Sequence, residues 1–157
     1  MEFKFTEENL TRIENARKKY PTALAAVMET VYIAQEQNGY ISNEVMEEIA
    51  NVLSIDKVNV LSVVTFYTMY HTKPMGKYHI QVCTNVSCML SGGEDIYAHV
   101  SKKLNIGHNE KTEDGKFSLE EVECMGACGG SPMIAINEDY YENVNISKVD
   151  ELIDSLK

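Results

Sequence analysis

The chain has 157 residues, of which 44% are hydrophobic and none is Trp, and its formal net charge is −10. This acid excess argues against nucleic-acid binding, which needs a basic face. The longest nearly apolar run, VLSVVTFYTMY, is shorter than the roughly 20 residues of a membrane helix, and the start, MEFKFTEENL, shows no apolar signal region. We therefore expect a soluble cytoplasmic protein, whose thiols stay reduced.

The first half of the chain has the apolar periodicity of helices. Helices are predicted to begin at the capping residues Thr6, Thr22, Ser42 and Asp56, with stops at Pro21 and Gly39. The apolar stripes of these helices are expected to include Leu10, Ile13 and Tyr20, then Leu24, Val27, Met28, Val31 and Tyr32, then Val45, Met46, Ile49, Val52 and Leu53, and last Val58, Leu61 and Phe66. Pro74 and Gly76 break the pattern and place a domain boundary near residue 75.

The second half alternates with a period of two in several short runs. Strands are expected in KYHIQVC, which ends at Cys83, in KFSLEEVEC, which ends at Cys124, and in MIAIN and YYENV. Helices are expected in GGEDIYAHVSKKLNI and in SKVDELIDSLK, where Ser147 and Asp150 have capping-box spacing. A strand–helix–strand unit favours parallel pairing, and the last two strands would add a hairpin.

This order predicts the α/β fold class. An N-terminal helical bundle over residues 1–75 is followed by a small α/β domain over residues 76–157, which resembles a thioredoxin fold. Each of the two cysteine pairs falls directly after a predicted strand of the second domain. Since the carboxyl ends of parallel strands share one edge of a sheet, we expect the pairs to meet there.

The chain has four cysteines, spaced as Cys83-x4-Cys88 and Cys124-x3-Cys128. Four thiolates suit either an iron–sulfur cluster or a zinc ion. The gaps are wider than the Cys-x2-Cys knuckles of structural zinc sites, which favours a [2Fe–2S] cluster with one pair on each iron. Zinc, disulfides and redox-active thiols remain alternatives at this point.

The neighbours of the cysteines support a cluster. Glycines in the segment VECMGACGGSP permit close backbone approach, so that N–H groups can point at sulfur; they are Gly126, Gly129 and Gly130. The histidines do not accompany the cysteines as a Rieske centre would require, and we interpret all four as ordinary core or surface residues: His71, His79, His99 and His108.

Two further groups have alternative interpretations. Phe66, Tyr67 and Tyr70 have the spacing of core residues on a helix, but tyrosines are also common in interfaces, so this group could instead form a partner surface. The second group, predicted on the solvent face of a strand, comprises Glu120, Glu121 and Glu123.

Other functions lack their motifs. A helix-turn-helix over residues 42–67 would have Lys57 as the only cation of its recognition helix. No Cys-x-x-Cys supports a thioredoxin-type enzyme, and neither G-x-G-x-x-G nor a P-loop supports nucleotide binding.

The segments VVTFYTMY, VCTNVSC and VECMGACGGSPM, after a helical first half, resemble the small [2Fe–2S] subunit of the NADH-oxidising module of complex I (NADH:quinone oxidoreductase). Related subunits occur in NAD-linked formate dehydrogenases and electron-bifurcating hydrogenases. The resemblance covers residues from Tyr20 onward.

The resemblance implies an electron-transfer subunit of an oxidoreductase. Its cluster ligands would be Cys83, Cys88, Cys124 and Cys128. The helical domain would dock on a partner subunit that binds FMN and NADH, and the complex would hold the chain at the cytoplasmic side of a membrane without direct insertion. The chain would not oxidise NADH alone.

Overall fold

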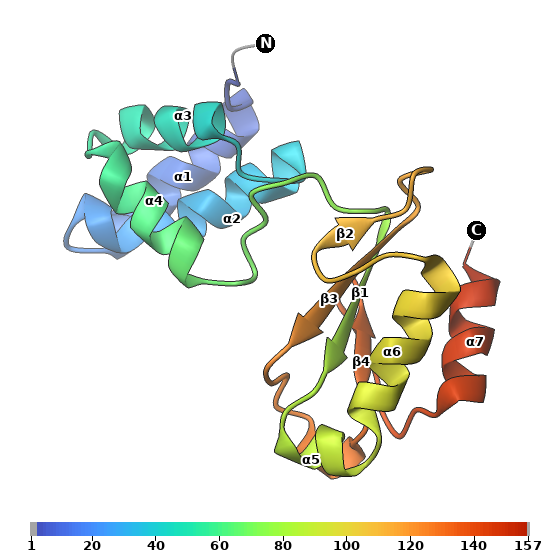
Figure 1. Cartoon of the computed structure of the whole chain (residues 1–157). Coiled ribbons are helices and arrows are strands. Elements are labelled where there is room, and N and C mark those ends of the chain that lie inside the picture. Colours follow the sequence, from blue (N-terminus) through green and yellow to red (C-terminus); the bar gives the residue numbers. More distant parts are fainter. Residues whose placement is uncertain (1–2, 157) are drawn as a thin grey trace. The chain divides into compact units, whose positions relative to one another are not determined.

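The computed structural model describes residues 3–156 and divides into two compact units, Met1–Pro74 and Met75–Lys157 (Figure 1). The first unit consists of helices and the second combines helices with a five-stranded mixed sheet. The predicted fold class, a helical bundle followed by a thioredoxin-like α/β domain, is confirmed.

The helical unit packs its elements around one apolar core. The elements are α1 (Glu7–Lys19), the 3-10 helix η1 (Ala23–Ala26), α2 (Val27–Asn38), α3 (Asn43–Leu53) and α4 (Lys57–Phe66). Residues that are fully buried in the core include Ile13, Val31, Val45, Ile49, Leu53 and Val60.

Local capping chemistry fixes several of these helix ends. The Thr6 hydroxyl accepts a hydrogen bond from the Asn9 backbone N–H at 3.2 Å, and the Ser42 hydroxyl accepts one from the Val45 N–H at 3.3 Å. Gly39 ends α2 with φ +81°, a left-handed conformation that glycine adopts without strain. These predicted ends are confirmed, whereas Thr22 makes no side-chain cap and precedes η1 rather than α2.

The predicted apolar face of α4 is wrong. The helix turns Val60 and Val64 into the core and leaves Val58, Leu61 and Phe66 exposed. Apolar residues lie on all sides of KVNVLSVVTF, so the periodicity of this segment does not define one face. Five residues that were expected on the buried apolar stripes of the earlier helices are exposed as well: Leu10, Tyr20, Leu24, Met28 and Tyr32.

The α/β unit is built on a sheet with the strand order β2-β3-β1-β4-β5. The strands are β1 (Tyr78–Cys83), β2 (Glu110–Lys111), β3 (Phe117–Val122), β4 (Ile134–Ile136) and β5 (Asp139–Tyr141), and the helices are α5 (Val86–Leu90), α6 (Gly93–Leu104), the 3-10 helix η2 (Cys128–Gly130) and α7 (Ile146–Ser155). β1 is parallel to β3 and antiparallel to β4.

Helices α6 and α7 lie side by side on one face of the sheet (Figure 1). The core between them and the strands is apolar. It includes Ile80 and Val82 of β1, Leu119 of β3, Ile134 of β4, Ile96 and Val100 of α6, and Val149 and Ile153 of α7. This packing buries the inward-facing side chains of β1 up to Val82, the residue before Cys83.

Three local features of this unit differ from the sequence expectation. The strand expected to end at Cys124 ends at Val122, and the short elements α5 and β2 were not predicted. The last helix is capped by the Asn145 side chain, which accepts from the Lys148 N–H at 2.9 Å, so the proposed capping box at Ser147 and Asp150 is wrong.

The two faces of α4 can be compared by one substitution on each. Val60→Ala removes a side chain that is 0% exposed, and we expect it to lower the free energy of unfolding of the helical unit by about 2 kcal/mol. Val58→Ala changes a side chain that is 64% exposed and should stay within about 0.5 kcal/mol of wild type. Denaturant unfolding of the full chain, followed by far-UV circular dichroism, measures both. Equal losses would contradict the orientation of α4.

Candidate metal centre

The parallel pairing of β1 and β3 brings the first cysteine of each pair to one end of the sheet. Cys83 is the last residue of β1 and lies opposite Val122, the last residue of β3. The pairing continues one step further, because the Thr84 N–H donates to the Val122 carbonyl at 3.1 Å. Cys124 follows two residues after Val122, so both cysteine-bearing segments leave the sheet at the same edge.

Cys83 and Cys88 form the buried half of the site. Cys83 is 4% exposed and Cys88 is 2% exposed, and they pack together with the buried Met133. Cys88 lies in the middle of α5, which begins where the Asn85 side chain accepts from the Val86 N–H at 2.7 Å. The short helix therefore turns the chain back, so that the second thiol of the pair faces the first.

Gly93 allows α6 to sit directly on this buried pair. A Cβ atom at Gly93 would lie 2.7 Å from the Cys83 carbonyl oxygen and 2.9 Å from the Cys88 carbonyl oxygen. Any side chain here would push α6 away from both cysteines. Sequence reasoning missed this residue, although the pair Gly92-Gly93 before a helical pattern is a signal of close backbone approach.

Cys124 and Cys128 form the exposed half of the site. Gly126 adopts φ +75°, and its N–H donates to the Cys124 sulfur at 3.4 Å. The predicted role of this glycine, an N–H directed at sulfur, is confirmed. Gly130 serves another purpose, because a Cβ there would collide with the Glu142 carboxylate.

The surroundings of Cys88 favour its neutral thiol over the thiolate. Burial raises the pKa of the Cys88 thiol, and its hydrogen bond with Cys83 and the nearby charge of Cys83 and Cys128 add to this effect. A backbone hydrogen bond at Met133 opposes the rise in this pKa. The interactions place Cys88 close to both Cys83 and Cys128. A Cys88 thiolate in such surroundings needs a positively charged centre to compensate it, and a bound metal centre would supply that charge.

A single metal ion and a two-iron cluster need different arrangements of ligands. Over residues 3–156, no three His, Cys, Asp or Glu side chains form a group that could hold one metal ion. Structural zinc requires four ligands around one centre. A two-iron cluster differs, since it distributes its four thiolates as two on each iron.

The opposite face of the sheet from α6 and α7 carries a buried polar network. The two ring nitrogens of His79 lie 2.8 Å from the Ser118 hydroxyl and 3.0 Å from the Glu120 carboxylate, which also accepts from the Gln81 amide at 2.9 Å. Glu120 is only 7% exposed, so its predicted place on a solvent face is wrong, whereas Glu121 and Glu123 are exposed. Glu120 is in phase with Ser118 along β3, and this alternation could have identified the network.

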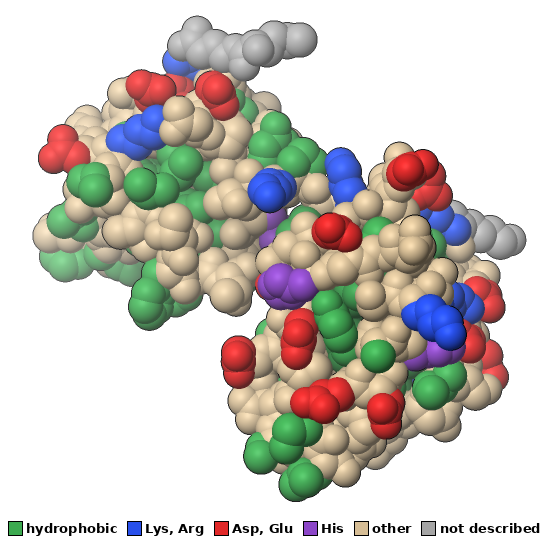
Figure 2. All heavy atoms as spheres, in the orientation of Figure 1, with side chains coloured by type: hydrophobic (Ala, Val, Ile, Leu, Met, Phe, Trp, Pro, Cys, Tyr) green, Lys and Arg blue, Asp and Glu red, His purple; other side chains and the backbone are tan. Residues whose placement is uncertain are grey.

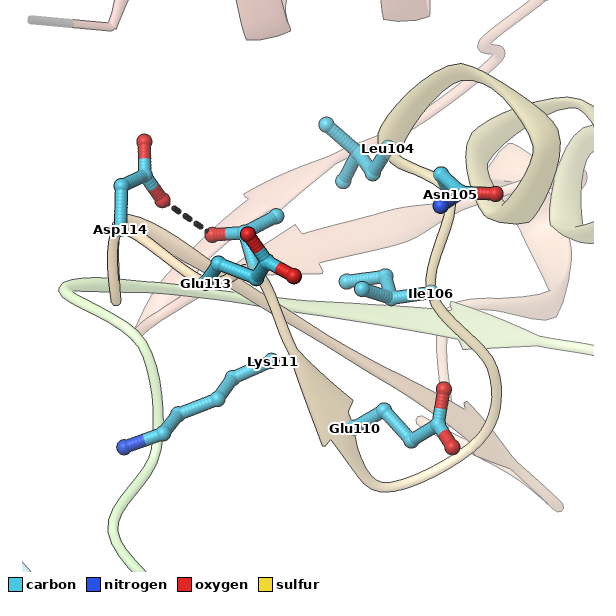
Figure 3. A pocket seen from close by; sticks show the side chains of 8 residues that line it. Leu104, Asn105, Ile106, Glu110, Lys111, Glu113 and Asp114 are labelled. Carbon is cyan, nitrogen blue, oxygen red and sulfur yellow. Dashed lines mark hydrogen bonds between the residues drawn. The ribbon is translucent and has the colours of Figure 1, made fainter.

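A hollow beside the β2–β3 hairpin lies at the other end of the strands (Figure 3). Its carboxylates hold the loops together: Glu110 accepts from the Gly107 N–H at 2.7 Å, and Asp114 accepts from the Thr112 hydroxyl and the Lys116 N–H. The charged side chains point in different directions, as Figure 3 shows, and they do not form a binding group.

None of the helices within residues 3–156 is both long and apolar enough to cross a membrane.

The aromatic residues at the end of α4 and after it differ in burial. Tyr70 is buried and its hydroxyl donates to the Met28 carbonyl at 3.0 Å, whereas Phe66 is 76% exposed. The core interpretation therefore holds for Tyr70 and fails for Phe66.

Two proteins named as subunits of NADH-quinone oxidoreductases are similar to this chain. A subunit of the NADH-quinone oxidoreductase of Rhizobium meliloti (strain 1021) is 41% identical over 145 residues, which are 92% of this chain and 86% of that protein. The corresponding NADH-quinone oxidoreductase subunit of Rickettsia typhi (strain ATCC VR-144 / Wilmington) is 43% identical over 155 residues, which are 97% of this chain and 91% of that protein.

A solved NAD+-reducing [NiFe]-hydrogenase, in its H2-reduced state, has the same fold with a TM-score of 0.70 over 87% of this chain. The match is 18% identical and spans 22% of that hydrogenase chain, so it is a likeness of fold. The family model described as "Thioredoxin-like [2Fe-2S] ferredoxin" matches residues 13–157. The chain belongs to the thioredoxin-like [2Fe–2S] ferredoxin family.

Proposed function

We propose that the chain carries one [2Fe–2S] cluster on Cys83, Cys88, Cys124 and Cys128, and that it transfers electrons as a subunit of an NADH-quinone oxidoreductase. The observation that supports this proposal is the parallel register of β1 and β3, because it makes Cys83 and the segment that leads to Cys124 leave the sheet at the same end. Family membership and the two relatives named as NADH-quinone oxidoreductase subunits support it.

The two halves of the site suit different tasks. When bound, the cluster supplies a centre that accepts and releases one electron at a time. The buried Cys83 and Cys88, backed by Met133, keep water from one side of the site. The exposed Cys124 and Cys128 leave the other side open to a partner. The Gly126 N–H, aimed at the Cys124 sulfur, stabilises negative charge there.

The chain depends on a partner for the chemistry of NADH. It has no G-x-G-x-x-G and no P-loop. We therefore assign NADH and FMN to a flavoprotein subunit of the same complex, on the cytoplasmic side of a membrane. The equivalent subunit of a hydrogenase or formate dehydrogenase is a weaker candidate, because the likeness to the hydrogenase concerns the fold alone.

Replacing any ligand should remove the cluster. Cys→Ala at position 83, 88, 124 or 128 should abolish the visible absorption and the bound iron and sulfide, since each iron needs both thiolates of its pair. Ser87→Ala, beside Cys88 on α5, should keep both. Metal and sulfide analysis after anaerobic purification measures the result. Stoichiometric zinc without sulfide in the wild-type protein would contradict the cluster, and an unchanged spectrum in one variant would exclude that cysteine.

The cluster should have a low reduction potential. Reduction adds negative charge to a site that already holds four thiolates, and histidine ligands, which relieve this charge in Rieske centres, do not accompany the cysteines. We expect a midpoint of roughly −200 to −450 mV. A titration followed by EPR should show a one-electron signal in the reduced state, and a midpoint above zero would contradict the ligand set.

The purified chain should not oxidise NADH by itself. Cluster-loaded protein mixed with NADH and an artificial acceptor should show no turnover above the buffer control, because a nucleotide-binding motif and a flavin motif are lacking. Addition of the flavoprotein subunit should produce turnover and reduction of the cluster. Rapid oxidation of NADH by the chain alone would refute the division of labour between the two subunits.

A further inference from the structure

The helix that carries Cys88 also carries an exposed apolar surface. Within α5, Cys88 is buried, but its neighbours Val86, Met89 and Leu90 are 59%, 41% and 80% exposed. The end of this helix touches the segment that follows Cys128, since the Ser91 and Ser131 hydroxyls lie 3.2 Å apart. Three large apolar side chains on a five-residue helix have no role in the core of the unit.

The segments that hold the cysteines are rich in acidic side chains. Residues 78–101 and 117–147 together have no Lys and no Arg. Their acidic residues are Glu94, Asp95, Glu120, Glu121, Glu123, Glu138, Asp139 and Glu142. Figure 2 shows hydrophobic side chains at the α5 end of this unit, with acidic side chains above them and the Lys and Arg side chains farther away. A lysine follows the second segment directly: the Lys148 ammonium donates to the Glu142 carbonyl at 2.8 Å.

Several of these carboxylates lie directly around the cysteines. Glu121 accepts from the Thr84 hydroxyl at 2.9 Å, immediately after Cys83 in the chain. Glu123 shares a hollow with Thr84, Glu121 and His108. Glu142 lies against Gly130 of η2, the 3-10 helix that begins at Cys128. Acidic groups thus border the site from β3 and from the segment after β5.

We propose that Val86, Met89 and Leu90, with Glu121, Glu123 and Glu142 at their border, form a surface of the α/β unit on which the electron-exchanging partner docks, in addition to the docking expected of the helical domain. This α5 surface would bind a protein face that has an apolar centre and a rim of Lys and Arg. The inference rests on the proposed function, because it takes the flavoprotein subunit as that partner. It adds which part of this chain the partner contacts and what chemistry its face must present.

The two parts of the surface act differently in docking. Apolar side chains at the centre of an interface lose contact with water and supply most of the binding energy. Acidic residues at a rim contribute little to affinity but attract a basic partner and orient its approach, most strongly at low salt. A partner seated on α5 lies against the helix that holds Cys88, so docking there brings its redox group next to the cluster.

Two variants test the surface in the cluster-loaded full chain. Leu90→Gln should slow reduction of the cluster by the NADH-reduced flavoprotein subunit at least roughly tenfold in stopped-flow measurements, because it places a polar group at the apolar centre. Glu121→Gln with Glu123→Gln should slow it roughly tenfold at low salt and much less at high salt. Both variants should keep the cluster spectrum. Leu90→Gln should keep the wild-type rate of reduction by dithionite, and the double glutamate variant should react with this anion no more slowly than wild type, because two negative charges are gone.

Matched controls separate docking from general effects. Tyr140→Gln changes an exposed residue of the edge strand β5, and Glu113→Gln with Glu138→Gln removes the same charge at the other end of the strands. These controls should react with the flavoprotein subunit like wild type. Hydrogen exchange gives a second readout: the amides of residues 86–91 should become protected when the flavoprotein subunit is added.

The outcomes of these experiments separate failure of the docking surface from failure of the proposed function. A wild-type chain that the flavoprotein subunit does not reduce would overturn the proposed function and, with it, the docking surface. Normal reduction of wild type together with unchanged rates in both α5-surface variants would overturn the surface alone. Protection of residues 86–91 at high concentration of the chain without the flavoprotein subunit would overturn it as well, because the occupant would be a second copy.

Discussion

The parallel pairing of β1 with β3 is the constraint on which the site depends. Cys83 and Cys124 are far apart in the sequence, yet the register that sets Cys83 opposite Val122 makes both segments leave the sheet at one edge. The apolar layer beneath α6 and α7 fixes that register, because a shift of one residue would turn Ile80 and Leu119 away from the core. The energy that aligns the cysteines therefore comes from aliphatic packing.

A second constraint couples the cluster to the fold through burial. The buried Cys83 and Cys88 are held between Met133 and the start of α6, where Gly93 leaves no room for a side chain. Burial there disfavours the Cys88 thiolate unless a cation compensates it. Iron would relieve this cost only after β1, α5 and α6 have come together, so binding of the cluster and completion of this end of the domain stabilise each other.

The sequence allowed prediction of the features that depend on spacing. Local sequence patterns determine strand alternation, helix caps such as Ser42, and the position of each cysteine pair just after a strand. Because the two strands are parallel, this position brings both pairs to the same edge of the sheet. The face of α4 could not be predicted, because its apolar residues lie on all sides. The burial of Glu120 depends on His79 of another strand, and the contact of Gly93 with the cysteines depends on how α6 meets the sheet.

The charge distribution of the α/β unit connects its redox and binding properties. Carboxylates near the cysteines disfavour the added negative charge of a reduced cluster, and the same carboxylates attract a basic surface. A partner that covers them with Lys and Arg would neutralise part of their field and exclude water from the exposed Cys124 and Cys128. Positive charge favours the reduced cluster, whereas loss of water opposes it. The potential of the isolated chain and that of the docked chain are therefore two different quantities, and the docked one governs electron transfer in the complex.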